Sequence, residues 1–387
     1  MFLEYLALRN FRNYRELEVG LDPGVILFSG ANAQGKSNLL EAVYFLALCK
    51  SFRAENEREV ISFSAVDELP YSRLIGSVKK RGSESVRVQV DIALLSSKTG
   101  LTEPSEIFQK KIRVNGIPRP VSRSVGNIAA VLFSADDIKL VTGSPALRRR
   151  FLDVLLSQVN PGYLRALQHY QRVLSHRNHL LRRIREDRSG PDELGFWDTQ
   201  LCDDAANLIL WRRDTLVQVA STISDIYGEL GTTDNRLLLS YEPTISSEGD
   251  VADIAERLTD QLMAARAKEI QVGQTLSGPH RDDVSILLEG RDAGKFASRG
   301  QLRSVALALR LAEARYLTSI LGEEPLLLLD DVLSELDPVR QKKVLETISN
   351  SQQSLLTIVD PSQHPITHQY ATSSYKISAG ELFPGDE

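Results

Sequence analysis

Residues 30–37 read Gly30-Ala31-Asn32-Ala33-Gln34-Gly35-Lys36-Ser37, which matches the phosphate-binding pattern G-x-x-x-x-G-K-[S/T]. In such a loop, glycines let the backbone wrap so that successive N–H groups point at a phosphate. The apolar run Val25–Phe28 before the loop is typical of a buried strand, and Asn38–Leu46 after it predicts a helix. The helix would direct its positive N-terminal dipole at the same phosphate. Strand, loop and helix thus follow in the order that a P-loop requires.

Each residue of this loop is predicted to contact a nucleotide. Lys36 is expected to bridge the β- and γ-phosphates, and the Ser37 hydroxyl is expected to ligate magnesium. The alternative interpretation is a glycine-rich turn without a ligand. No Asn-Lys-x-Asp segment that would read guanine occurs in the chain, which favours ATP over GTP.

Two adjacent carboxylates, Asp330 and Asp331, follow the four leucines Leu326–Leu329. A P-loop needs a carboxylate at the end of a neighbouring buried strand to hold the magnesium shell. Asp330 is predicted to orient the magnesium waters, and Asp331 is predicted to act as the base for the attacking water. Lys36 and Asp331 are therefore the predicted catalytic residues. The alternative is that the two acids cap a helix.

A third motif, Ala297–Gln301, precedes a helix rich in leucine and alanine. It resembles the signature motif of ABC-type ATPases, with Arg299 in place of one glycine. In those proteins the motif closes over the nucleotide of a second protomer. The resemblance implies that Ser298, Gly300 and Gln301 bind ATP in trans, and that the chain forms an ATP-dependent homodimer.

Composition limits the class of protein. The 387 residues are 42% hydrophobic, and the two cysteines, Cys49 and Cys202, suit a reducing compartment. No signal peptide or membrane-spanning run is visible, so a cytoplasmic protein without a membrane partner is expected. Although the net charge is −5, the segment from Lys139 to Arg185 contains ten Lys or Arg residues and one acid, Asp153. This segment is either a solvated helix face or a surface that follows DNA phosphates.

The hydrophobic pattern changes along the chain. Strand-like segments occupy both ends, whereas apolar residues in the middle recur at helical spacing, as at Tyr170, Leu174 and Leu181. The expected fold is α/β, with a nucleotide lobe made from residues 1–143 and 273–387. Residues 144–272 are expected to form an inserted helical arm, whose longest helices would have about 25 residues and span about 38 Å.

Five segments together resemble the RecF family of recombination-repair ATPases. They are Asn10–Tyr14, Lys50–Arg53, Gly143–Asp153, Ser277–Asp283 and Asp330–Asp337. The resemblance implies an ABC-type ATPase head, related to SMC and Rad50 heads, with a short arm. It also implies that Arg12 and Asn13 lie near the nucleotide, that Arg53 approaches the phosphates, and that Ser334–Asp337 crosses the dimer seam.

The resemblance further implies a function. RecF proteins bind DNA and dimerise in an ATP-dependent way, hydrolyse ATP slowly, and work with RecR and RecO to load RecA at single-strand gaps. Replication restart and SOS induction depend on this step. Asp331 stands where many ABC proteins have Glu, and the switch position is open between Asp360 and His364. The block His280-Arg281-Asp282 is either an internal ion-pair network or a DNA or nucleotide contact.

Two other classes of protein are less compatible with the sequence. A transporter nucleotide-binding subunit would have only a short helical subdomain between the P-loop and the signature, whereas Ser37 and Ser298 here are far apart. A nuclease-linked ATPase of the overcoming-lysogenisation type would carry an acidic metal-binding domain after the head. Only about 50 residues follow Asp337.

Overall fold

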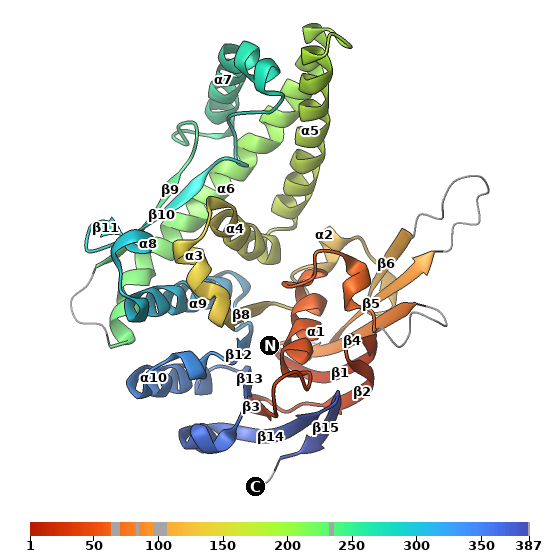
Figure 1. Ribbon diagram of the computed structural model, residues 1–387, viewed down its shortest axis with the longest axis vertical. Coiled ribbons are helices and arrows are strands. Elements are labelled where there is room, and N and C mark those ends of the chain that lie inside the picture. Colours follow the sequence, from red (N-terminus) through yellow and green to blue (C-terminus); the bar gives the residue numbers. More distant parts are fainter. Residues whose placement is uncertain (63–69, 83–84, 96–106, 232–235, 386–387) are drawn as a thin grey trace. The chain divides into compact units, whose positions relative to one another are not determined.

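A computed structural model describes residues 1–62, 70–82, 85–95, 107–231 and 236–385 (Figure 1). Two compact units make up the chain. The first combines the two ends, Met1–Asp137 and Leu307–Glu387, with a short segment that begins at Glu229. The second consists of Ile138–Gly228 and Thr233–Ala306. Within the described residues, no helix is both long and apolar enough to cross a membrane.

The first unit contains a six-stranded sheet whose order is β15-β14-β3-β13-β12-β8. Its strands are β3 (Gly24–Ser29), β8 (Ala130–Ser134), β12 (Leu326–Asp330), β13 (Gln353–Ile358), β14 (Ala371–Ser378) and β15 (Glu381–Pro384). All neighbours pair in parallel except β14 and β15. The four strands from β3 to β8 are almost wholly buried, as expected for a parallel sheet covered on both faces.

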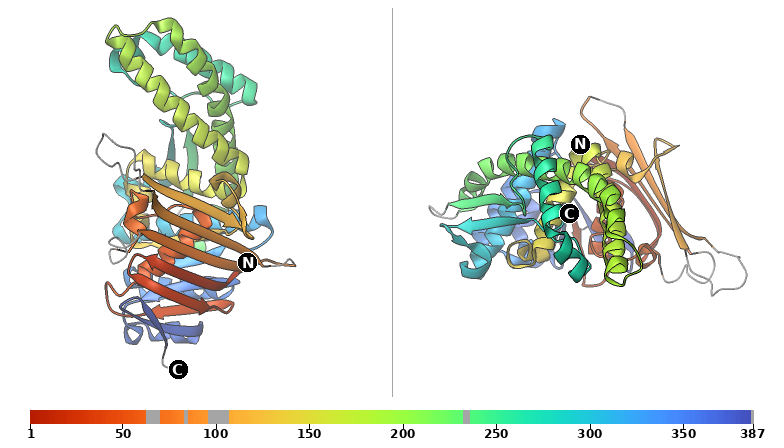
Figure 2. Two further views of the ribbon diagram at one scale, coloured as in Figure 1. Left: turned by 90° about the vertical axis from the view of Figure 1, so that its right-hand side faces the viewer. Right: turned by 90° about the horizontal axis from the view of Figure 1, so that it is seen from above.

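A second sheet of the first unit is antiparallel, with the order β2-β1-β4-β5-β6-β7, and its long strands lie side by side in Figure 2. These strands are β1 (Phe2–Phe11), β2 (Tyr14–Gly20), β4 (Tyr71–Lys79), β5 (Val86–Leu95), β6 (Ile107–Val114) and β7 (Ile117–Pro118). Helix α1 (Lys36–Leu48) contacts strands of both sheets. Every residue of α1 from Leu39 to Leu48 is buried. The P-loop helix is therefore the core of this unit.

Shorter elements complete the first unit. They are α2 (Val121–Ser124), α10 (Pro338–Ser349) and the 3₁₀ turns η1 (Glu57–Val60), η3 (Ala135–Asp137), η5 (Leu333–Glu335), η6 (Pro361–Gln363) and η7 (Pro365–Gln369). Asp337 caps α10, because its side chain accepts hydrogen bonds from the N–H groups of Val339 and Arg340. Helix α9 (Arg299–Leu321) begins in the second unit and continues into the first.

The second unit is mainly helical. Its helices are α3 (Ile138–Thr142), α4 (Pro145–Val159), α5 (Pro161–Arg185), α6 (Leu194–Glu229), α7 (Val251–Val272) and α8 (Ala293–Phe296), with the 3₁₀ turn η4 (Pro191–Glu193) between α5 and α6. Local sequence sets the starts of two long helices. The side chains of Asn160 and Asp250 each accept two backbone N–H groups at the first turns of α5 and α7.

Helix α6 corrects the predicted arm length. It has 36 residues, so it extends about 54 Å at 1.5 Å per residue, rather than the 38 Å expected from helices of about 25 residues. The apolar stripe of α6 continues beyond Trp211, where Leu216, Val219, Ile223 and Ile226 are buried. A polar outer face conceals this continuation in the sequence.

The boundary after residue 272 differs from the expected one. The chain remains in the second unit until Ala306, whereas a return to the head was expected at residue 273. The reason is that β10 (Asp283–Leu288) pairs with β9 (Leu237–Glu242) and with the short β11 (Arg291–Asp292) in a separate three-stranded sheet.

Candidate nucleotide site

The P-loop connects β3 to α1, and two of its glycines have backbone angles that favour glycine. Gly30 has a φ of 150° and Gly35 a φ of 120°. A Cβ atom at Gly30 would lie 2.4 Å from the Ile377 carbonyl oxygen, and one at Gly35 would lie 2.7 Å from Asn13 Nδ2. Gly30 is therefore required by close packing against the backbone as well as by conformation, whereas Gly35 is required by conformation.

Lys36 is held at the mouth of this loop. Its Nζ donates to the carbonyl oxygens of Gly30 at 2.5 Å and Ala31 at 2.9 Å. Burial lowers the pKa of Lys36, and the negative charges of Asp331 and Asp330 oppose that change. The ammonium group is thus pre-positioned by main-chain acceptors that a phosphate oxygen could replace.

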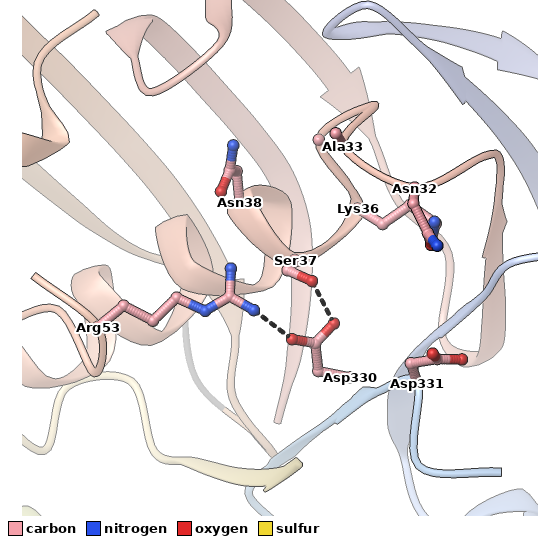
Figure 3. Close-up of a pocket in the computed structure, with 9 residues that line it drawn as sticks. Asn32, Ala33, Lys36, Ser37, Asn38, Arg53, Asp330 and Asp331 are labelled. Carbon is pink, nitrogen blue, oxygen red and sulfur yellow. Dashed lines mark hydrogen bonds and ion pairs between the residues drawn. The ribbon is translucent and has the colours of Figure 1, made fainter. Parts of the chain in front are cut away.

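Asp330 lies next to Ser37 because parallel strands end at one edge of the sheet. β13 separates β3 from β12, and the loops after β3 and β12 meet at their carboxyl ends. The Ser37 hydroxyl donates to Asp330 Oδ1 at 2.7 Å, and Arg53 donates to Asp330 Oδ2 at 2.9 Å (Figure 3). The Thr357 hydroxyl on β13 also lies 3.1 Å from Asp330 Oδ1.

Asp331 adopts the left-handed backbone region, with a φ of 51°. Its N–H donates to the Thr357 hydroxyl oxygen at 3.0 Å, which holds this conformation. Burial raises the pKa of Asp331, the charge of Asp330 raises it further, and Lys36 opposes both. A carboxylate with a raised pKa is a better proton acceptor than an ordinary aspartate.

These residues enclose a polar pocket of about 230 Å³. It is lined by Asn32, Ala33, Gly35, Lys36, Ser37, Asn38, Arg53, Asp330 and Asp331 (Figure 3). The donor set fits magnesium, because a serine hydroxyl and an aspartate carboxylate already face each other and both are oxygen ligands that this ion accepts. Gly30, Ala31 and Gln34 belong to the same loop but do not line the pocket directly.

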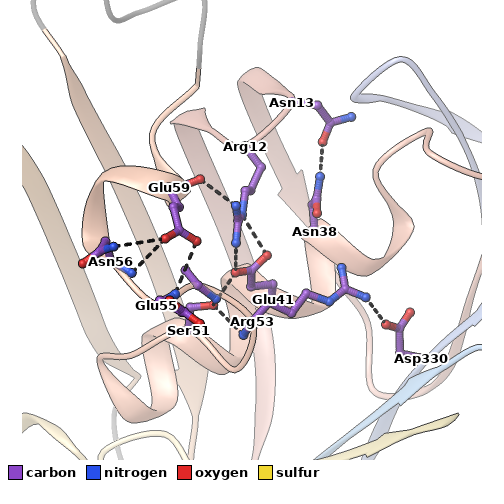
Figure 4. A network of polar contacts seen from close by, with 11 residues as sticks. Arg12, Asn13, Asn38, Glu41, Ser51, Arg53, Glu55, Asn56, Glu59 and Asp330 are labelled. Atoms are coloured by element: carbon purple, nitrogen blue, oxygen red, sulfur yellow. Dashed lines mark hydrogen bonds and ion pairs between the residues drawn. The ribbon is translucent and has the colours of Figure 1, made fainter. Parts of the chain in front are cut away.

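Arg12 holds the P-loop helix instead of lining this pocket. Its Nε and one terminal nitrogen donate to the buried carboxylate of Glu41 at 3.0 and 2.7 Å, and the other terminal nitrogen donates to the Glu59 carbonyl (Figure 4). The Ser51 hydroxyl also donates to Glu41. The structure thus places Arg12 against the P-loop helix, outside the set of residues that line the pocket.

Asn13 contacts the loop directly. Its Nδ2 donates to the Gln34 carbonyl at 2.9 Å, and its Oδ1 accepts from Asn38 at 2.8 Å (Figure 4). Asn38 lines the pocket, so Asn13 supports both the loop and a pocket residue. Thr357 and Asn38 are the two residues of the site that the sequence did not single out. A lone threonine among Leu355, Leu356 and Ile358 is the one signal that could have revealed Thr357.

The predicted signature residues lie at the exposed start of α9, in the second unit. The Ser298 N–H donates to Gln301 Oε1 at 2.8 Å, and the Gln301 N–H donates to Ser298 Oγ at 3.3 Å. This reciprocal pair is a capping box. Ser298 is exposed and Gly300 leaves its surroundings open, so the N-terminus of a 23-residue helix is accessible to an anion.

The two candidates for the switch position differ in their contacts. The Asp360 carboxylate accepts the Ser362 N–H and hydroxyl and so caps η6. The charge of His364 instead lowers the pKa of Asp331, which places this histidine near the predicted base. Its Nδ1 is buried and has no hydrogen-bond partner within the described residues. This electrostatic interaction with Asp331 favours His364 over Asp360 for the switch position.

Comparison with known proteins decides the family. The family model described as the RecF/RecN/SMC N terminal domain matches residues 2–380. The chain is 39% identical to the DNA replication and repair protein RecF of Chloroflexus aurantiacus, with both chains covered completely. It is 40% identical to that of Herpetosiphon aurantiacus, over 99% of this chain and 100% of the relative.

This chain belongs to the RecF family.

Solved structures agree. A recombination mediator protein RecF, studied as RecF-ATP in the RecFOR pathway, superposes with a TM-score of 0.87 at 30% identity, covering 100% of this chain and 98% of that one. A Smc head domain from Pyrococcus furiosus superposes with a TM-score of 0.54 at 15% identity, which shows the fold alone. The expected ABC-type ATPase head of the SMC kind is confirmed.

The block His280-Arg281-Asp282 is internal to the second unit. The buried Asp282 carboxylate accepts hydrogen bonds from Thr244 and Tyr241, and the Tyr170 hydroxyl lies 2.6 Å from His280 Nδ1. Burial lowers the pKa of His280 to about 4. These contacts support the internal-network interpretation of this block.

The basic segment divides into two groups. Arg148 forms a bidentate pair with Asp283, Arg149 donates to the Asp282 carbonyl, and the buried Arg177 pairs with Asp198 and Glu269. These three arginines hold the second unit together. The remaining arginines of α5 are exposed.

Proposed function

We propose that this RecF-family protein is an ATP-dependent DNA-binding protein of recombinational repair, in which ATP closes a homodimer on DNA. The observation that carries the proposal is the 2.7 Å contact between Ser37 and Asp330 beside Lys36. A hydroxyl and an ammonium group of a P-loop, together with a carboxylate at the end of a neighbouring strand, are the groups that hold a magnesium-bound triphosphate.

Binding would begin with exchange of hydrogen bonds. Lys36 would turn from the carbonyls of Gly30 and Ala31 to the β- and γ-phosphates, and the N–H groups of residues 31–37 would surround the β-phosphate. Ser37 and Asp330 would hold Mg²⁺, which neutralises phosphate charge when bound. Arg53 pairs with Asp330 in this structure. Once Asp330 holds Mg²⁺, Arg53 would be released to contact a phosphate oxygen.

Hydrolysis would depend on Asp331. Its position in the pocket and its raised pKa suit a base that orients and deprotonates the attacking water. The site would remain incomplete until Ser298, Gly300 and Gln301 of a second chain approach the γ-phosphate. Slow, DNA-stimulated hydrolysis follows from this requirement and would set the time of release.

The biological role proposed for the dimer rests on the family. RecF relatives are named for DNA replication and repair, and a solved relative is a recombination mediator of the RecFOR pathway. We infer that this protein acts in the cytoplasm at single-strand gaps or junctions, with RecR and RecO, to promote RecA loading. Replication restart and SOS induction would follow.

The proposal is tested by sedimentation velocity with and without ATP, magnesium and a short duplex DNA. Wild-type protein is expected to become a dimer with ATP and to bind the duplex only then. Lys36→Met is expected to remain monomeric, since it lacks the ammonium group that holds the phosphates. Equal dimerisation of the two proteins with ATP would refute the proposal. Lys342→Met, which removes an exposed lysine on α10, is the matched control.

A further inference from the structure

Helix α5 carries an exposed basic stripe that the internal network does not use. Its members recur at spacings of three, four and seven residues, which places them on one face. We name as the basic stripe the residues Arg165, Arg172, His176, His179 and Arg183, all of them exposed. At 1.5 Å per residue the stripe is about 27 Å long.

Few acidic groups face this stripe, although the charge of Arg172 reaches Asp204 of α6. Helix α5 contains no acidic residue. The nearby acids of α6 are committed elsewhere, since Asp198 pairs with Arg177 and Arg266, and Asp204 pairs with His169. Within the described residues, Arg165 and Arg172 form no ion pair, and Arg183 donates to the Arg188 carbonyl at 3.3 Å. The three arginines of the stripe, which are always charged, suit a chain of phosphates.

Aromatic rings lie against the middle of the stripe. The His176 ring stacks on Trp197 of α6, with centroids 5.1 Å apart and planes 22° apart. Phe196 meets Trp197 edge to face at 5.1 Å, and 65% of Phe196 is exposed. We name Phe196 and Trp197 the aromatic step. Trp197 packs against the buried clusters of the second unit. The exposed Phe196 ring is not a member of these clusters.

We infer that the basic stripe and the aromatic step form a binding site for single-stranded DNA, in which the stripe follows the phosphates and the exposed Phe196 ring, supported by Trp197, stacks with an unpaired base. Aromatic stacking requires bases that a duplex keeps enclosed, whereas cations alone would accept either form. The stripe would accommodate about eight nucleotides at roughly 3.4 Å each. The inference rests on the proposed DNA-binding function and adds a strand preference and a location.

The two tryptophans of the chain, Trp197 and Trp211, allow a direct test. In a Trp211→Phe protein, Trp197 is the only tryptophan and its emission reports on the aromatic step. Oligothymidylate is expected to quench this emission, and a blunt duplex of equal length is not. Quenching is expected to disappear in Arg172→Glu/Arg183→Glu. If oligothymidylate binds, as measured by anisotropy, without quenching Trp197, the site is not here and the inference is overturned.

Affinity gives a second measurement. Phe196→Ala is expected to weaken oligothymidylate binding roughly 5- to 150-fold, the effect of losing one stacked base. Val217→Ala, which trims an equally exposed apolar residue of α6, is the matched control and is expected to bind normally. Both variants should keep ATP-induced dimerisation, which separates failure of this site from failure of the proposed function. If Phe196→Ala binds DNA with unchanged affinity but no longer binds purified RecR, the inference is overturned. The aromatic step would then be a protein interface.

Discussion

Arg53 donates to Asp330 Oδ2 at 2.9 Å, so the carboxylate proposed to hold magnesium is paired with an arginine and a serine (Figure 3). The guanidinium places a positive charge against this carboxylate. Because 42% of the Arg53 side chain is exposed, the pair itself contributes little to stability. We expect the pair instead to keep a cation beside the phosphates of bound ATP.

The Arg53 contact leads to a prediction about affinity. Arg53→Ala should change the free energy of unfolding by less than about 1 kcal/mol. It should weaken binding of magnesium-ATP about tenfold, because a charge-assisted hydrogen bond to phosphate is lost. Calorimetric titration and urea unfolding would measure the two quantities. A large loss of stability with unchanged ATP affinity would contradict this role.

Asp331 is expected to act in hydrolysis and not in binding. Asp331→Asn should bind ATP and form dimers normally, while hydrolysis falls about 100-fold or more. In the wild-type protein, hydrolysis should decline as the pH falls through the pKa of Asp331, which lies above that of an ordinary aspartate. Single-turnover rates over a pH series measure this. Equal rates in Asp331→Asn and wild type would assign the base elsewhere.

Glu41 connects the P-loop helix to Arg12, and we expect its loss to act through stability. Glu41→Gln leaves the Arg12 guanidinium beside a neutral buried amide instead of a carboxylate. The free energy of unfolding should therefore fall by about 2 kcal/mol. Glu59→Gln, an exposed acid of the same network, should cost less than about 1 kcal/mol. Urea unfolding compares the two variants. Equal losses would show that Arg12 does not need Glu41.

His280 predicts a dependence of stability on pH. Its pKa is about 4 in the folded protein and about 6.5 in an unfolded chain, so only the unfolded state binds the proton between these values. Stability should therefore fall as the pH decreases from 6.5 to 4, by about 3 kcal/mol from this residue. His280→Gln should show a flatter dependence in the same range. If the stability of His280→Gln depends on pH in the same way as that of the wild type, His280 is not the cause of the dependence.

Much of the nucleotide site could be predicted because its chemistry is local. Gly30 to Ser37 need particular backbone angles and a following helix, and both are visible in eight residues. Asp330 could be placed because four leucines before an acid indicate a buried strand, and parallel strands end together. The role of Thr357 could not be found in this way, since the hydrogen bonds that it makes join two strands and depend on sheet order.

Long-range contacts limited the remaining predictions. The basic segment gave no sign that Arg148 and Arg149 would bond to the Asp282–Asp283 segment while Arg172 and Arg183 stay exposed, because burial depends on tertiary packing. The extent of α6 was underestimated for a related reason. Its residues beyond Trp211 that are buried lie on one side of the helix, and the other side is polar.

The central claim is that ATP is shared between the P-loop of one chain and Ser298 of another, and complementation tests it most directly. Lys36→Met lacks a working P-loop and Ser298→Arg lacks a working signature, so neither should dimerise with ATP alone. A mixture of the two contains one complete site per heterodimer, and sedimentation with ATP should show a dimer. A mixture of wild type with the double variant Lys36→Met/Ser298→Arg contains no complete site in its heterodimers and is the control. A Ser298→Arg protein that dimerises with ATP as well as wild type would contradict the account.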